Sequence, residues 1–127
     1  MRTVTGQVIQ TLRDAGATVG DATGVGLTPP FLVVYPQTQW RDDGTLGDPW
    51  EHVAKRFQVT CEGLSREQAE WWADWVEQTL IGAAGLGRVV PDHRGDIVRD
   101  DSTGQPARWK AFVRFRLHFF EDISHGS

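Results

Sequence analysis

The clearest pattern of apolar and polar positions lies in the middle of the chain. Phe57, Val59 and Cys61 alternate with polar neighbours, which is the period of a strand with one buried face. Ser65 follows as a natural N-cap, and Gln68 stands three residues later, as in a capping box. The sequence therefore predicts a strand that leads directly into a helix.

The residues after Ser65 repeat with the period of a helix, and we expect one apolar stripe to face the sheet. This stripe consists of Ala69, Trp72, Ala73, Val76 and Leu80. Trp71 and Trp75 fall outside it, among acidic and polar side chains. Two indoles on an outer helix face predict cover by a loop of this chain or by another subunit, and we favour the subunit.

The amino-terminal part predicts one helix and one strand. Residues 2–15 have helical periodicity and lead into Gly16, a common helix stop. Residues 17–30 are rich in Gly and Thr and end in two prolines, so we expect a connector. Residues 31–35 are a nearly continuous apolar run, typical of a buried strand.

Residues 37–51 predict an extended loop or hairpin arm, because Gly and Asp favour turns. Long loops in compact domains are usually functional or disordered, and tryptophans argue against disorder. We expect this arm to contact another protein. Its candidate interface residues are Trp40, Asp42, Asp43 and Trp50.

The carboxyl-terminal part predicts two short strands, at residues 88–90 and 97–99, and one long strand at residues 109–119. Apolar residues alternate with mainly polar ones along the long strand, and its polar face is cationic. Arg114 and Arg116 lie on that face. We expect both to pair with carboxylates of this chain or of a neighbour, and we include them among the candidate interface residues.

These elements predict a single α+β domain over residues 1–127. Two helices would pack on one face of a mainly antiparallel, four- to five-stranded sheet, with the arm extending from it.

The composition of the chain argues against nucleic-acid binding and against a location in the membrane. Acidic residues outnumber basic ones, with a net charge of −4, whereas nucleic-acid affinity needs clustered Lys and Arg. No stretch approaches the ~20 apolar residues of a membrane span, and the amino terminus lacks the apolar segment of a secretory signal. We therefore expect a soluble protein with no membrane partner. The lone Cys61 fits a packing role in a reducing compartment.

Candidate metal chemistry is restricted to two carboxylate pairs, Asp42-Asp43 and Asp100-Asp101, with Asp92, His93 and Asp96 nearby. Their spacing matches neither a calcium-binding loop nor a zinc site. Motifs for a nucleophilic serine, a zinc protease or a phosphate-binding loop do not occur. We expect no catalytic, cofactor or metal site and no enzymatic activity. A small metal-dependent enzyme built on the carboxylate pairs is the remote alternative.

Several segments resemble, in order, the tail terminator proteins of long-tailed, siphovirus-like phages, especially those of actinobacterial hosts. The central strand and helix of that family resemble FQVTCEGLSREQAEWWADWVEQTLIG, its first strand resembles FLVVYP, its acidic hairpin region resembles DGTLGDP, and its closing segment resembles VRDDSTGQPARWKAFVRFRL. The resemblance covers most of the chain from Phe31 onward.

This resemblance implies a structural virion protein that forms a homo-hexameric ring. Such a ring caps the major tail tube protein, stops its polymerisation and presents a surface to the head-tail connector protein. DNA passes through the lumen without specific binding. The protein would assemble in the host cytoplasm and reside at the head-proximal end of the tail. Another head-tail connector or tail-completion protein is the alternative.

Overall fold

The computed structural model describes residues 4–36, 40–41, 52–83, 86, 88–101 and 107–120. The elements are, in chain order, α1 (Val4–Asp14), β1 (Val19–Asp21), β2 (Phe31–Pro36), β3 (Trp40–Arg41), β4 (His52–Gly63), α2 (Arg66–Ile81), β5 (Arg88–Arg94), β6 (Val98–Asp100) and β7 (Arg108–Phe120).

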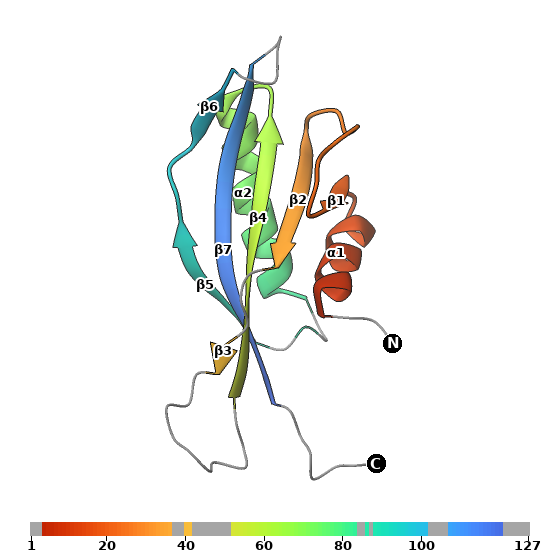
Figure 1. The fold of residues 1–127 in the computed structure, drawn as a ribbon, viewed down its shortest axis with the longest axis vertical. Coiled ribbons are helices and arrows are strands. Elements are labelled where there is room, and N and C mark those ends of the chain that lie inside the picture. The colour runs from red at the N-terminus through yellow and green to blue at the C-terminus, as the bar shows by residue number, and fades with distance from the viewer. Residues whose placement is uncertain are drawn as a thin grey trace.

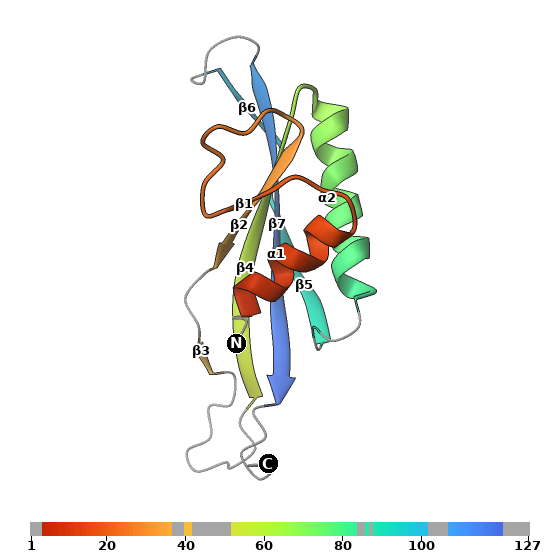
Figure 2. The same ribbon diagram turned by 90° about the vertical axis from the view of Figure 1, so that its right-hand side faces the viewer.

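The described strands form one seven-stranded sheet, whose main path runs β1-β2-β4-β7-β5. The short strands β3 and β6 pair with β4 and β7. Only β1 and β2 pair in parallel; the other described pairs are antiparallel. Both helices lie on one face of this sheet (Figures 1 and 2). The expected α+β fold is therefore confirmed, with a sheet that has two more strands than the upper limit we expected.

The strand β1 lies inside the segment that the sequence predicted to be a plain connector. It has only three residues and two of them are Gly20 and Asp21, which strands usually disfavour. It pairs in parallel with β2 because the connecting loop carries the chain back to the start of β2. This loop, residues 22–30, lies on the side of the sheet away from the helices (Figure 2). A Cβ atom on Gly24 would meet the Phe31 ring at 2.4 Å, so this crossing loop packs tightly on β2.

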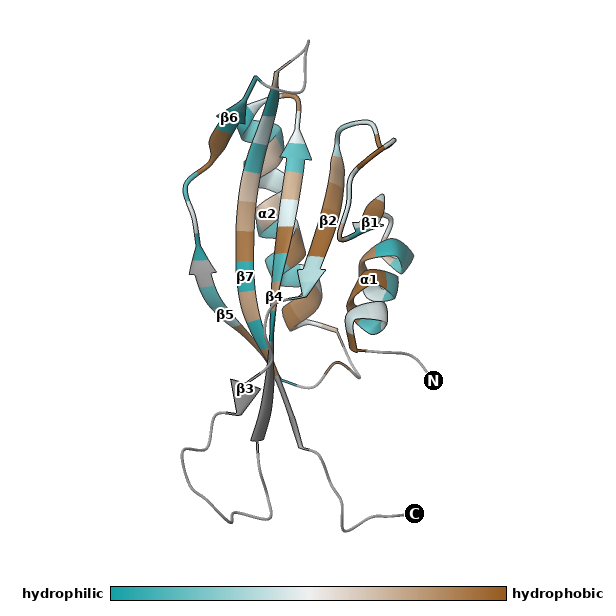
Figure 3. Ribbon diagram, viewed as in Figure 1, coloured by the Kyte–Doolittle hydropathy of each residue, from teal (hydrophilic) through white to brown (hydrophobic). Residues whose placement is uncertain are grey.

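The main core lies between the sheet and the helices. Val8 and Leu12 of α1 and Val76 and Leu80 of α2 are buried there. From the sheet, the rings of Phe57 and Phe115 stack with centroids 5.6 Å apart. Figure 3 shows the corresponding patterns: β2 is apolar along most of its length, whereas β4 and β7 alternate. The predicted apolar stripe of α2 is buried, apart from Trp72, which is half-buried.

The start of α2 is fixed by its cap. Ser65 has extended backbone angles, and its Oγ accepts a hydrogen bond of 3.1 Å from the Gln68 amide. The Gln68 side chain returns a bond, but its Oε1 accepts from the Leu64 amide at 2.8 Å rather than from Ser65 itself. The reciprocal bond is thus displaced by one residue from the usual capping box.

We predict that Ser65→Ala lowers the free energy of unfolding by about 1 kcal/mol, because it leaves an amide at the start of α2 without its acceptor. Ser65→Asp keeps an acceptor and should remain close to wild type. Urea unfolding of the three proteins measures the effect. Equal stability of the Ala and Asp variants would contradict the role given to this cap.

Candidate interaction surfaces

Three tryptophans form a ladder on α2. The centroids of Trp71 and Trp72 lie 4.9 Å apart and those of Trp72 and Trp75 5.1 Å apart, both pairs edge to face. Trp71 is 58% exposed. Trp75 is half-buried and packs against the core, so the expectation that it points away is wrong. Its indole lies edge to face with that of Trp72, which also packs against the core.

Acidic side chains line the helix beside this ladder. Glu67, Glu70 and Asp74 are exposed. Arg94 of β5 reaches across to α2, where its Nη1 lies 2.7 Å from Asp74 and 2.9 Å from Glu77. Among the described residues, Glu67 and Glu70 have no such cationic partner. We call Glu67, Glu70 and Trp71 the helix patch.

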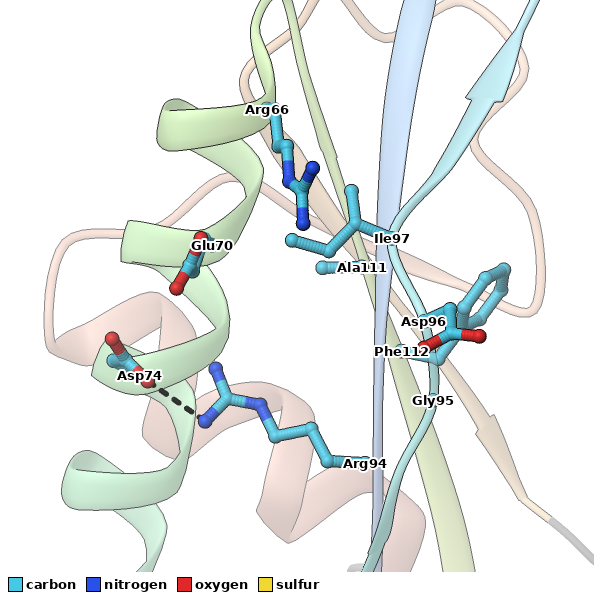
Figure 4. A pocket seen from close by; sticks show the side chains of 9 residues that line it. All are labelled: Arg66, Glu70, Asp74, Arg94, Gly95, Asp96, Ile97, Ala111 and Phe112. Atoms are coloured by element: carbon cyan, nitrogen blue, oxygen red, sulfur yellow. Dashed lines mark ion pairs between the residues drawn. The ribbon is translucent and has the colours of Figure 1, made fainter.

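A cavity of about 230 Å³ lies between α2 and the segment that joins β5 to β6. Figure 4 shows Arg66 and Arg94 entering it from opposite sides and the Phe112 ring lying beyond the strand, away from α2. Between the last residue pair of β5 with β7 and the first pair of β6 with β7, the edge segment has three residues, Gly95, Asp96 and Ile97. The strand β7 has only two residues over the same stretch, Ala111 and Phe112. The cavity therefore marks a bulged sheet edge, which the Arg94 ion pairs hold against α2.

The opposite face of the sheet carries the predicted cations of β7. Arg114 donates from Nε to the Gln58 side-chain oxygen at 2.9 Å, and Arg116 Nε lies 3.9 Å from an oxygen of Asp92. Of these two arginines, only Arg116 has a described carboxylate within ion-pair distance, and its Nε makes no hydrogen bond. We call Arg114 and Arg116 the arginine pair.

Sheet register explains this accumulation of charge. Arg56 of β4 stands directly opposite Arg116, so a third guanidinium lies beside the pair. The bulge between Pro91 and His93 brings Asp92 into reach of Arg116. Arg56 was not among the residues predicted from the sequence, although extending the alternation of Phe57 and Val59 backwards would have placed it on this face.

Charges are better balanced toward the other end of the same face. Glu62 is only 7% exposed and lies 3.8 Å from Arg108 and 3.9 Å from Lys110. Lys110 also binds Asp100 at 3.1 Å. Arg108 lies over the Phe31 ring, 5.6 Å from its centroid. Among the described residues, Glu62 and Asp100 thus neutralise the cations at this end of the face, whereas Arg114 has an amide oxygen as its acceptor.

Of the candidate interface residues predicted in the arm, the structure describes only Trp40. Trp40 lies in β3, opposite Ala54 of β4. Asp42, Asp43 and Trp50 lie outside the described residues, together with most of the predicted arm.

The carboxylate pair Asp100-Asp101, proposed as metal ligands, forms ion pairs with cationic side chains of this chain. Asp101 binds Arg99 at 3.0 Å, and Asp100 binds Lys110. No group of three potential ligand side chains within the described ranges is arranged to hold a metal ion.

No protein-family model matches this chain, and no curated protein matches it at a significant level. Among the described helices, none has the length and apolar character needed to cross a bilayer.

The thiol of Cys61 is buried in the core between the sheet and the helices, and this burial makes the stability of the fold depend on pH. Burial raises the pKa of its thiol from 9.0 to about 12, against a weaker lowering by the charge of Arg94. Above pH 9 the unfolded chain releases this proton while the folded chain keeps it, so stability falls as pH rises.

Between pH 8 and pH 10, wild type should lose about 1 kcal/mol more stability than Cys61→Ala, since the variant has no thiol to ionise. Urea unfolding at the two pH values measures this difference. Parallel losses in the two proteins would mean that the thiol is not held in the neutral form by burial.

Proposed function

We propose that this protein is a tail terminator: a structural virion protein that forms a hexameric ring on the tail tube, ends its polymerisation and offers the joining surface to the head connector. The observation that carries the proposal is the presence of contact features on both sides of one small domain. Trp71 is exposed on the helix layer, and the arginine pair lies on the opposite sheet face. The resemblance of the sequence to tail terminators supplies the biological setting.

Contact features on two different faces favour assembly of many copies. A contact between unlike surfaces repeats from subunit to subunit, and it closes into a ring when the rotation between neighbours allows. A ring that matches the tube on one side but offers no tube-like surface on the other ends the polymer. Termination is then a geometric effect and requires no catalytic group.

The charge of the chain suits a channel for DNA. With a net charge of −4 per subunit, the ring as a whole repels phosphates, so the genome would pass without strong retention. The screening length of about 8 Å at physiological salt means that groups close to the duplex still act on it. In this proposal, the arginine pair faces a protein neighbour and not the channel.

The virion phenotype tests the proposal directly. Particles made without this protein should have tails longer than those of wild type and no attached heads, because the tube has no cap. Negative-stain electron microscopy measures both features. Tails of normal length that lack heads would instead assign the protein to head-tail connection, the related alternative.

We predict that Trp71→Glu weakens ring assembly without unfolding the subunit, because the indole is already 58% exposed. Val25→Glu is the matched control: it places the same charge at an apolar side chain that is 89% exposed in the crossing loop. Sedimentation velocity over a concentration series compares them. The interface role of Trp71 is rejected if both variants assemble as wild type does.

Duplex DNA should bind weakly to the purified protein, in agreement with its negative net charge. A fluorescence anisotropy titration at low salt measures the affinity. Submicromolar binding with a steep salt dependence would favour a DNA-contacting connector over a terminator.

A further inference from the structure

We infer that neighbouring subunits join head to tail, with the helix patch of one copy seated on the arginine pair of the next. This inference rests on the proposed ring and names the contact that builds it. The occupant of the open sheet face is thus a second copy of this chain.

The sheet face has cationic groups with remaining capacity to bind carboxylates. Arg114 is exposed and bonded to an amide oxygen of Gln58, and Arg116 is 3.9 Å from its one described carboxylate, Asp92. Guanidinium groups recognise carboxylates through paired N–H donors. An incoming acidic surface would therefore gain hydrogen bonds as well as charge neutralisation.

The helix patch offers the complementary groups. Glu67 and Glu70 are exposed on α2, and among the described residues neither has a cationic partner at ion-pair distance. They lie three residues apart, where like charges repel across a helix surface. A cationic neighbour would remove this repulsion.

Aromatic groups extend the match beyond charge. Trp71 directly follows Glu70 on α2 and lies four residues after Glu67, with most of its side chain exposed. On the sheet, Phe112 is half-buried, and Figure 4 shows its ring on the side away from α2. An indole can stack on a guanidinium or contact a phenyl edge, and both arrangements are favourable. Trp71 is therefore placed to anchor the contact that the glutamates orient.

The helix patch and the arginine pair lie on opposite layers of the domain. This placement favours a head-to-tail contact over a two-fold symmetric dimer. A sheet-to-sheet dimer would bring arginine pairs together, and a helix-to-helix dimer would bring glutamates together. Only the unlike pairing joins opposite charges, and such a contact propagates from copy to copy.

Charge reversal on each face, followed by mixing, tests the inference. The sheet variant carries Arg114→Glu and Arg116→Glu, and the helix variant carries Glu67→Lys and Glu70→Lys. Each variant alone should lower the association constant about 10-fold or more, because its altered face repels the intact one. An equimolar mixture should recover wild-type sedimentation, since the two altered faces attract each other.

Two controls keep the experiment interpretable. Arg99→Glu and Asp14→Lys each reverse an exposed charge outside both patches and should assemble as wild type. Arg116 is partly buried, with 27% of its side chain exposed. If the double sheet variant does not fold, the exposed Arg114→Glu alone serves in the same mixing test.

The possible failures are distinct. Normal assembly of either folded variant alone, or no recovery on mixing, rejects this contact and leaves the terminator proposal standing. Wild-type protein that stays monomeric with and without tail tubes rejects both. Capture of a polyglutamate peptide by the sheet face, without self-association, would assign that face to a different acidic partner and overturn the inference.

Discussion

The pairing of β4 with β7 is the constraint on which the rest of the structure depends. Twelve consecutive partners run from His52 opposite Phe120 to Gly63 opposite Trp109. Because side chains alternate with a period of two, this register sends Phe57 and Phe115 into the core and turns Arg56 and Arg116 to the other face. A slip of one residue would bury the arginines and expose the phenylalanines, so packing strongly fixes the register.

The same register produces two unlike surfaces from one sheet. Helix α2 covers one face and carries its own acids outward, while the other face is partly covered by the loop at residues 22–30 and otherwise presents charge (Figure 2). Glu62 shows how part of that charge is neutralised internally, since Arg108 and Lys110 flank it. Arg114 lacks such a carboxylate among the described residues. Along β7, the cations beside Glu62 are therefore neutralised within the chain, whereas Arg114 can bind a carboxylate of another copy in the proposed contact.

Local sequence signals predicted the elements with strong periodicity. The alternation around Val59 and the cap at Ser65 were sufficient for β4 and the start of α2. The strand β1 was missed because its pairing partner, and not its composition, makes it a strand. Trp75 was misplaced because a helical wheel gives a direction for Cβ, whereas the final position of an indole depends on neighbours such as Trp72. The ion pairs of Arg94 with α2 depend on tertiary structure and have no local signal.

If the proposed function is correct, termination requires only that a ring fits the end of a tube and offers no further site for growth. This claim can be measured with purified components: tail tube protein is allowed to polymerise while increasing amounts of the present protein are added, and tube lengths are counted by electron microscopy. Elongation should stop when about one hexamer is present per growing end, and capped ends should carry a six-fold ring that is open at its centre. Unchanged tube lengths at a large molar excess, with no ring at the ends, would contradict it.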